Sequence, residues 1–455
     1  MSALGPRRTF TSTLPLPDSK CWTSMTQLNQ RFARNHGMRC YHGMMPTDDD
    51  PQPSDPAFAV PDEALHEAVQ LLTSYRSIDS LSIETDIPAH LPANGVGERS
   101  LLPILAQHVI GGASKLDTPL SFAHMDPPTP WLTWAMTLWN ARLNQNLLHP
   151  ATAPAARDIE QRVVAWLAPF FGMDGGHMVP GSTVANLTAI WAAREMRGVV
   201  EVAAPETAHV SIEKSARLLG LRYRPLPTDA QGRLLADSAI DLDHSCLVLV
   251  AGATSTGVID PLHLAGRAAW THVDAAWAGP LRLSAQHRWR LDGIEQADSV
   301  AVSAHKWLFQ PKESALVFFK NTASAHSALT FGGAYLAAPN IGLMGSHGAI
   351  AVPLLAMLWA WGQDGLASRL DRCMSAAERF ADFVEGEERL ELLARPETGV
   401  IVWRVRGKKA EDIAAKLPVG LVSQTTVAGA RWLRCVAANP NIDVDRVIAA
   451  VQSAI

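Results

Sequence analysis

Two short apolar runs constrain the fold of this chain more than any other feature of its sequence. Residues 270–273 form the first run, which ends at Asp274, and residues 299–303 form the second, which is followed by His305 and Lys306. Buried parallel strands have this composition, and their carboxyl ends deliver polar side chains to one edge of an α/β sheet. The sequence therefore predicts a mainly parallel sheet that presents Asp274 and Lys306 at the same edge.

An acid and an amine at one sheet edge are the two protein groups that pyridoxal phosphate needs. The amine forms an imine with the cofactor's aldehyde, and the carboxylate keeps the pyridinium nitrogen protonated, so that the ring accepts electrons from a carbanion. Taken alone, Asp274 is more readily an ordinary strand-end acid, and Lys306 a surface lysine. The motifs around them favour the cofactor.

A phosphate-binding turn is predicted upstream of these residues. Gly181, Ser182 and Thr183 precede a helical stretch that runs to Arg197. A helix start of this kind presents free backbone N–H groups and the positive end of the helix dipole, where a phosphate fits. Because Ser and Thr are also the commonest ordinary N-caps, this motif gains its weight from its position before Asp274 and Lys306.

Two further polar positions follow predicted strands. His209 comes after a strand at residues 199–203, where a flat ring can stack on a flat cofactor, and the alternative is a capping or core histidine. The buried run at residues 247–251 leads into a hydroxyl-rich segment that contains Thr254. Hydroxyl groups at a strand's carboxyl end bind cofactor oxygens or cap a turn.

Five motifs carry a resemblance to a known family. Residues 180–187, 208–214, 252–261, 272–277 and 303–307 occur in the order and spacing of the group II pyridoxal-phosphate-dependent amino-acid decarboxylases, which include the aromatic amino acid, glutamate and diaminobutyrate decarboxylases. The resemblance implies fold type I (aspartate-aminotransferase-like), bound pyridoxal 5'-phosphate, and a homodimer with active sites at the subunit interface. The implied enzyme is a carboxy-lyase that converts an L-amino acid to the amine and carbon dioxide.

The same resemblance assigns roles to individual residues. Lys306 resembles the Schiff-base lysine, Asp274 the partner of the pyridinium nitrogen, and His209 the histidine that stacks on the ring. Thr254 resembles the residue near the cofactor's 3'-hydroxyl side, and Ala276 the small residue packed beneath the ring. The phosphate-binding positions are matched by Ser182, Thr183, Ser303 and His305.

The chain departs from the family pattern between Phe331 and Gly348. The decarboxylases carry a long mobile loop here, with a tyrosine that is thought to reprotonate the carbanion, whereas this interval is short and contains only Tyr335. Gly345-Ser-His347-Gly is similar to the Gly-Ser-Arg-x-Gly of the sphingosine-phosphate lyase and archaeal decarboxylase branch, with His347 in place of arginine. Tyr335 and His347 are candidate catalytic groups, and a structural role is the alternative for each.

The fate of the carbanion therefore stays open at this point. Oxidative deamination to an aldehyde, transamination and retro-aldol cleavage use the same carbanion, and a degenerate scaffold subunit is a further alternative. The substrate is not identified by the sequence. His124 and Asp126 lie in a Pro-rich loop of the kind that lines pockets, and Asp126 hints at a basic substrate side chain. Arg434 is the positional candidate for binding the substrate carboxylate, or else a solvated strand arginine.

The domain organisation follows from composition and periodicity. Residues 1–57 form an extension and linker that is disordered or transit-like, since the first part is basic and rich in Ser and Thr. A helical, dimer-forming segment is expected over residues 58–150, a large cofactor-binding domain over 151–350 and a small α+β domain over 351–455. Helices are predicted at residues 131–143, 155–170 and 443–455, and strands at 399–405 and 432–436.

Composition excludes several other classes of protein. The net charge is −5 and no basic stripe is interleaved with aromatics, so nucleic acid is not an expected partner. The five cysteines are scattered and lack metal-ligand spacing, which predicts no metal site and suits a reducing cytoplasm. The longest apolar run, residues 348–362, is shorter than the roughly 20 residues that a membrane span needs.

Overall fold

The computed structural model describes residues 62–74 and 87–455, and the chain divides into two units at the Gly111–Gly112 bond. In the first unit, the described elements are α2 (Asp62–Ser74), α4 (Glu98–Leu105) and a π-helical turn at Ala106–Ile110. The predicted extension at residues 1–57 lies outside the described residues. The predicted domain limits at 58–150, 151–350 and 351–455 stay predictions.

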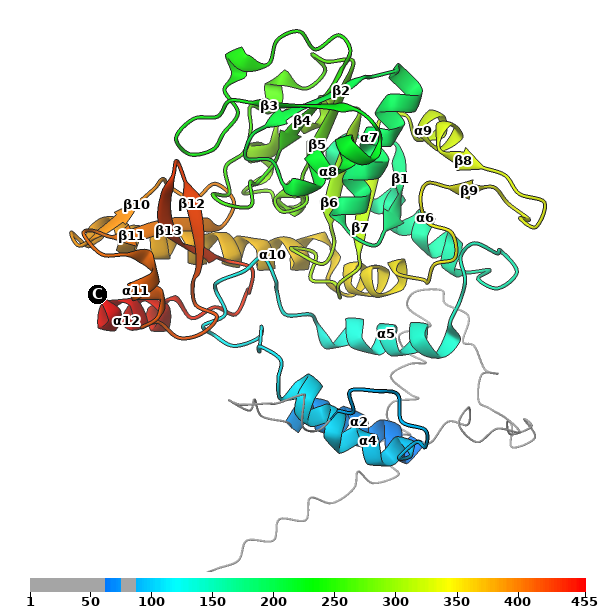
Figure 1. Ribbon diagram of the computed structural model, residues 1–455, viewed down its shortest axis with the longest axis horizontal. Coiled ribbons are helices and arrows are strands. Elements are labelled where there is room, and N and C mark those ends of the chain that lie inside the picture. Colours follow the sequence, from blue (N-terminus) through cyan, green and yellow to red (C-terminus); the bar gives the residue numbers. More distant parts are fainter. Residues whose placement is uncertain (1–61, 75–86) are drawn as a thin grey trace, which may run out of the picture. The chain divides into compact units, whose positions relative to one another are not determined.

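A seven-stranded sheet forms the centre of the second unit (Figure 1). Its order is β1-β7-β6-β5-β4-β2-β3, and β7 alone runs antiparallel to its neighbours. The strands are β1 (Gly175–Val179), β2 (Glu201–Pro205), β3 (Arg222–Leu226), β4 (Ser245–Val250), β5 (Trp270–Asp274), β6 (Ser299–Ser303) and β7 (Ala315–Phe319). This arrangement confirms the predicted mainly parallel α/β sheet.

Both faces of this sheet are buried, which explains its continuous apolar strands. Along β4, Leu247 and Leu249 pack into the core on one face, whereas Cys246 and Val248 pack into a second core on the other. The first core includes side chains of α6 (Ala156–Leu167), and the second includes those of α7 (Ser182–Arg197) and α8 (Val210–Leu218). Beyond β7, α9 (Thr322–Ala328) leads to the short pair β8 (Thr330–Phe331) and β9 (Asn340–Ile341).

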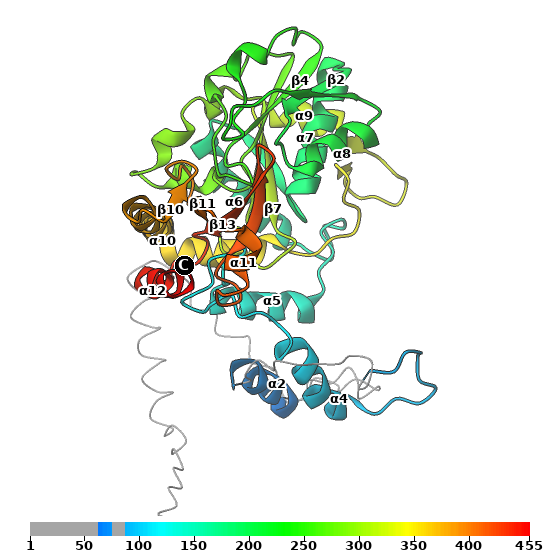
Figure 2. The same ribbon diagram turned by 60° about the vertical axis from the view of Figure 1, so that its left-hand side comes forward.

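The C-terminal part forms the predicted small α+β domain. Its antiparallel sheet has the order β10-β11-β13-β12, and the views in Figures 1 and 2 place it beside α10 (Ala351–Gly386), a long helix bent at Gly362. The other elements are β10 (Leu390–Leu392), β11 (Val400–Val405), α11 (Ala410–Ala414), β12 (Ser423–Val427), β13 (Ala430–Val436) and α12 (Val444–Ala454). No helix in residues 62–74 and 87–455 has the length and apolarity that a membrane crossing requires.

Two stacked tryptophans join the two sheets at the edge that carries the predicted site. The rings of Trp277 and Trp307 stack with a centroid separation of 4.0 Å. Trp277 donates its indole N–H to the carbonyl of Thr398, and Trp307 donates to the carbonyl of Ala437, at 2.7 and 3.1 Å. The loops after β5 and β6 are therefore held against the small domain.

Candidate active site

Asp274 and Lys306 lie at the same edge of the central sheet. Asp274 is the last residue of β5, and Lys306 lies in the loop that follows the adjacent strand β6. Burial lowers the pKa of the Lys306 ammonium, and the negative charge of Asp274 opposes this shift. A lysine with a lowered pKa offers more neutral amine at a given pH, which is the form that attacks an aldehyde. The structure thus brings these two predicted residues together.

The Asp274 carboxylate is buried and held by two donors. Its side chain is 5% exposed. Oδ1 accepts the backbone N–H of Ala276 at 3.1 Å, and Oδ2 accepts an amide N–H of Asn186 at 2.9 Å. Because buried polar groups are costly without hydrogen-bond partners, these two donors offset part of the cost of burying the carboxylate. Ala276, predicted beneath the ring, is itself buried two residues after Asp274.

His209 lies within electrostatic range of both residues. It is the N-cap of α8, and its Nδ1 accepts the backbone N–H of Ser211 at 3.2 Å and lies 2.8 Å from the Ser211 hydroxyl. Partial desolvation lowers the pKa of His209, Asp274 raises it, and Lys306 lowers it further. Since Nδ1 already accepts, Nε2 is the ring nitrogen left to donate. The structure therefore places the predicted stacking histidine with Asp274 and Lys306.

The four predicted phosphate positions converge from two segments. Ser182 and Thr183 open α7, and no side chain caps this helix. A Cβ placed on Gly181, the N-cap, would lie 3.9 Å from the His305 ring, so the helix start and the segment after β6 are neighbours. Ser303 Oγ and His305 Nδ1 are buried and have no hydrogen-bond partner among residues 62–74 and 87–455. Burial lowers the pKa of His305 to about 4, with Lys312 and Lys306 contributing.

Arg434 reaches this edge from the small domain. It lies on β13, donates from Nη1 to the carbonyl of Thr254 at 2.7 Å, and donates from Nε to the Ser423 hydroxyl at 3.1 Å. Its positive charge also acts on Lys306. The predicted carboxylate-binding arginine and the predicted Thr254 are therefore in direct contact.

A second charged group borders the lysine. Asp126 forms an ion pair with Lys312, and the charges of both residues act on Lys306. His124 lies two residues before Asp126 and is exposed. This ion pair brings the predicted Pro-rich loop to the site from a distant part of the sequence.

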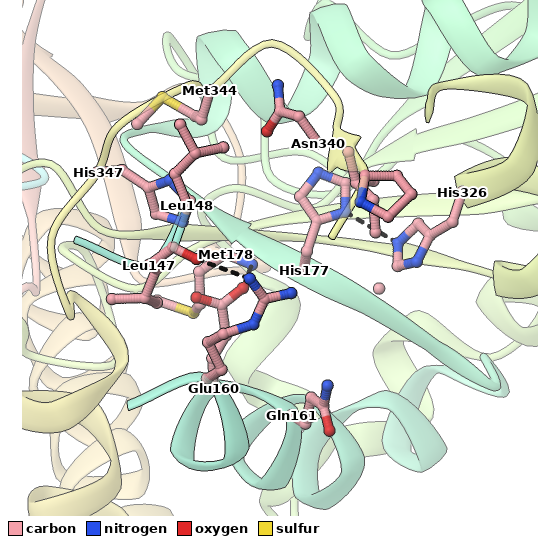
Figure 3. Close-up of a pocket in the computed structure, with 14 residues that line it drawn as sticks. Leu147, Leu148, Glu160, Gln161, His177, Met178, His326, Asn340, Met344 and His347 are labelled. Carbon is pink, nitrogen blue, oxygen red and sulfur yellow. Dashed lines mark hydrogen bonds between the residues drawn. The ribbon is translucent and has the colours of Figure 1, made fainter. Parts of the chain in front are cut away.

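The two candidate proton donors lie elsewhere in the same chain. Tyr335 is 77% exposed between β8 and β9, which Figure 1 places beside α9 at the β1 edge of the sheet, away from β5 and β6. His347 lines a separate pocket of about 170 Å³ whose facing wall includes Glu160 and His177 (Figure 3). Its Nδ1 donates to the carbonyl of Gly345 at 2.7 Å. Neither residue is among the charged groups that act on Lys306 in its own chain. The catalytic roles of Tyr335 and His347 stay predictions.

A comparison with known protein families covers most of the chain. Residues 82–406 match the pyridoxal-dependent decarboxylase conserved domain. The chain belongs to the pyridoxal-dependent decarboxylase family. This finding confirms pyridoxal phosphate as the cofactor and an amino-acid decarboxylase, a carboxy-lyase, as the enzyme class.

Relatives within the pyridoxal-dependent decarboxylase family bear the names of different amino acids. The chain is 29% identical over 379 residues to the L-2,4-diaminobutyrate decarboxylase of Rhizobium meliloti, covering 75% of this chain and 76% of the relative. It is 27% identical over 348 residues to the aspartate 1-decarboxylase of Aliivibrio fischeri, covering 63% of each. These sequence similarities therefore support decarboxylation but do not identify the substrate.

Solved structures of decarboxylases share this fold. The structure of Oryza sativa TDC with PLP and tryptamine superimposes with a TM-score of 0.77 at 22% identity, covering 89% of this chain and 98% of that one. The likeness, together with the sheet order, confirms the predicted fold type I architecture.

The residues at the sheet edge fit the cofactor of this family. Ser303 Oγ and His305 Nδ1 are buried polar atoms that lack partners in the part of the chain that the structure describes, as atoms that bind a phosphate would before it is bound. The uncapped start of α7 adds free backbone N–H groups beside them. In the described part of the chain, no three His, Cys, Asp or Glu side chains are grouped to bind a metal ion.

Sequence reasoning missed a set of buried residues behind Asp274. Asn186 donates to Asp274 and accepts from His272, and both residues are fully buried. A signal for each was present in the sequence. Asn186 lies one helical turn after Ser182, and His272 lies two residues before Asp274 on one strand, so each shares a face with a predicted site residue.

Proposed function

We propose that this chain decarboxylates an L-amino acid with a charged side chain, at a site built on Lys306 and Asp274. The observation that carries the proposal is the convergence of a desolvated lysine, a doubly hydrogen-bonded carboxylate and His209 at one sheet edge. When bound, pyridoxal phosphate supplies a protonated ring that accepts the electron pair left by carbon dioxide. The products are the amine and carbon dioxide.

The chain's own groups have distinct tasks in this proposal. Lys306 supplies a neutral amine to the cofactor aldehyde, because burial lowers the pKa of its ammonium. Asp274 holds the ring nitrogen's proton, and its two donors keep the carboxylate oriented. Arg434 binds the substrate carboxylate through N–H groups not used on Thr254 and Ser423. A carboxylate bound in this way is oriented before the bond to Cα breaks.

The ion pair of Asp126 and Lys312 supports a charged substrate side chain. Both groups are partly exposed, with side-chain accessibilities of 39% and 61%, and both lie close enough to Lys306 to shift its pKa. A substrate side chain of either sign would exchange with one member of the pair and leave the other available for solvent. The diaminobutyrate and aspartate decarboxylases among the relatives are named for charged amino acids of opposite sign.

We further propose that the working enzyme is a homodimer with active sites at the subunit interface. On α5 (Trp131–Leu143), Trp131, Trp134 and Trp139 are 71%, 45% and 58% exposed. Exposed apolar patches of this kind are typical of interaction surfaces. A second copy also gives Tyr335 and His347 an active site to act on, since neither lies near Lys306 in its own chain.

Product analysis tests the proposed reaction. Purified protein with bound pyridoxal phosphate is incubated with single amino acids, and carbon dioxide, amine, aldehyde and hydrogen peroxide are measured. The expected result is equal amounts of carbon dioxide and amine, abolished by Lys306→Ala. Aldehyde with peroxide would instead establish oxidative deamination, and no turnover of any amino acid would favour a scaffold role.

A further inference from the structure

A buried hydrogen-bonded chain of side chains runs from the interior of the sheet to the active site. Its members have exposed fractions of 0–2%. In order they are Trp270, Ser299, His272, Asn186 and Ser211, joined at 2.9, 2.9, 3.0 and 2.9 Å. From this chain, Asn186 also contacts Asp274 at 2.9 Å, and Ser211 contacts His209 at 2.8 Å. It therefore links the predicted partner of the ring nitrogen, Asp274, to the predicted stacking residue, His209.

The direction of these hydrogen bonds is determined at Asp274. An ionised carboxylate only accepts, so the Asn186 atom that faces it is Nδ2. The second hydrogen of Nδ2 points to Ser211 Oγ. Asn186 Oδ1 is left as an acceptor, and it receives the Nε2 hydrogen of His272. One amide group thus serves three partners, with both of its N–H hydrogens and its oxygen engaged.

The far end of the chain agrees with this direction. Burial lowers the pKa of His272 to about 4, so the ring is neutral near pH 7 and carries one N–H. With Nε2 protonated, Nδ1 accepts the Ser299 hydroxyl at 2.9 Å. Ser299 Oγ in turn accepts the indole N–H of Trp270, which only donates. Each hydrogen in this series of side chains, from Trp270 to Ser211, therefore has one position in which every donor finds an acceptor.

We propose that Asn186 is a positioning residue that sets Asp274 and His209 in register with the cofactor. Its amide fixes the plane of the Asp274 carboxylate directly and orients the Ser211 hydroxyl toward His209 Nδ1. A reversed amide would set its oxygen against the Asp274 carboxylate and remove one of the two donors to that carboxylate, so Asn186 has one favoured orientation. His272 matches that orientation with its Nε2–H tautomer.

The test uses binding of pyridoxal phosphate to the apoenzyme, because a purely structural residue would change stability alone. The inference rests on the proposed site, so wild type is measured first, with Lys306→Ala beside it. If wild type shows no lysine-dependent absorbance change with pyridoxal phosphate, the proposed site fails. If wild type binds and the Asn186 variants bind equally well, only the positioning role fails.

Three variants separate positioning from packing. Asn186→Ala removes the amide, Asn186→Asp keeps its volume but opposes the Asp274 carboxylate with a second one, and Ser211→Ala removes only the branch to His209. Asn439→Ala is the matched control, since Asn439 is also fully buried but donates to the carbonyls of Leu116 and Thr118, away from the site. Melting temperature is measured for all four.

Asn186→Ala is expected to weaken cofactor binding by about tenfold or more, the typical loss for a hydrogen bond to a charged group. Asn186→Asp should make binding more steeply pH-dependent than in wild type, because two facing carboxylates share a proton. Ser211→Ala should bind within about threefold of wild type, since the bond to Asp274 remains. If Asn186→Ala does not fold, the pyridoxal phosphate affinity and pH profile of Asn186→Asp provide the test. Wild-type affinity and pH profile in Asn186→Asp, with a lowered melting temperature as in Asn439→Ala, would overturn the proposal.

Discussion

Trp277 and Trp307 stack with ring centroids 4.0 Å apart, and each follows one of the two residues that define the active site. Trp277 lies just beyond Asp274, and Trp307 is the neighbour of Lys306. Since both indole N–H groups bond to carbonyls of the small domain, the pair fixes the acid and the amine relative to each other and to that domain.

Removing one ring should therefore cost stability. Trp277→Ala is expected to lower the free energy of unfolding by about 3–5 kcal/mol, through loss of buried contacts and the cavity left behind. Urea unfolding of the protein with and without cofactor measures the change. Trp289→Ala, at a position 60% exposed, should stay within about 0.5 kcal/mol of wild type. Equal effects for both variants would contradict the role of the stacked pair.

Arg434 should affect substrate use and not cofactor binding. Arg434→Met is expected to lower kcat/KM by about 10- to 100-fold, the range for losing hydrogen bonds to a charged carboxylate. Steady-state kinetics with the identified substrate measures this loss. Arg431→Met is the control, because Arg431 lies on the same strand and pairs with Glu411. If Arg431→Met reduced activity as much, the carboxylate would be bound by another group.

The Asp126–Lys312 pair should set the preference for substrate charge. Lys312→Met frees the carboxylate and is expected to shift kcat/KM about tenfold toward amino acids with a side-chain ammonium. Asp126→Asn should shift the preference toward side-chain carboxylates by a similar factor. The ratio of kcat/KM for diaminobutyrate and aspartate is the measurement. Lys320→Met is the control, because Lys320 is also an exposed lysine but donates to the carbonyl of Glu295. An unchanged ratio in both variants would remove this pair from substrate recognition.

His272 should make the fold sensitive to acid. Burial lowers the pKa of this histidine from 6.5 to about 4, so the unfolded chain binds its proton more readily than the native chain. The stability from this residue is complete above pH 6.5 and falls as the pH drops toward 4, by about 2 kcal/mol at pH 5. Urea midpoints at pH 7.5 and 5 should differ less in His272→Gln than in wild type. The exposed His263→Gln should retain the wild-type difference.

The exposed tryptophans of α5 predict the assembly state. Trp139→Asp is expected to shift the protein from dimer to monomer, because a carboxylate would be buried in an apolar contact. Sedimentation velocity across a concentration series measures the distribution. Trp289→Asp provides an exposed tryptophan outside α5 and should leave the distribution unchanged. A wild-type protein that sediments as a monomer would refute the dimer directly.

The sequence was most informative where one local pattern determined one element. The apolar runs that end at Asp274 and before Lys306 became β5 and β6, and the helix predicted at residues 131–143 is α5 (Trp131–Leu143). The strand predicted at 199–203 lies at Glu201–Pro205 instead. Its pairing with β3 and β4 begins at Glu201, and tertiary pairing overrides the apolar start at Val199.

Contacts between distant segments were beyond the reach of local patterns. Asn186 and His272 appeared in motifs without a role, because their partnership depends on how α7 packs against β5. The pairing of Asp126 with Lys312 likewise joins two loops far apart in sequence. Exposure of Tyr335 depends on where the β8–β9 segment lies, which its short sequence does not determine.

The connection from β6 to β7 has a consequence for how such an enzyme diversifies. Ser303 pairs with Ala315 across these antiparallel strands, so the loop that carries Lys306 is pinned at both ends by one rigid sheet. Adding or deleting a residue there would displace the cofactor's anchor. New substrate preferences must therefore arise from the loops that only border the lysine, such as the one bearing Asp126, where mutation leaves the reaction centre in place.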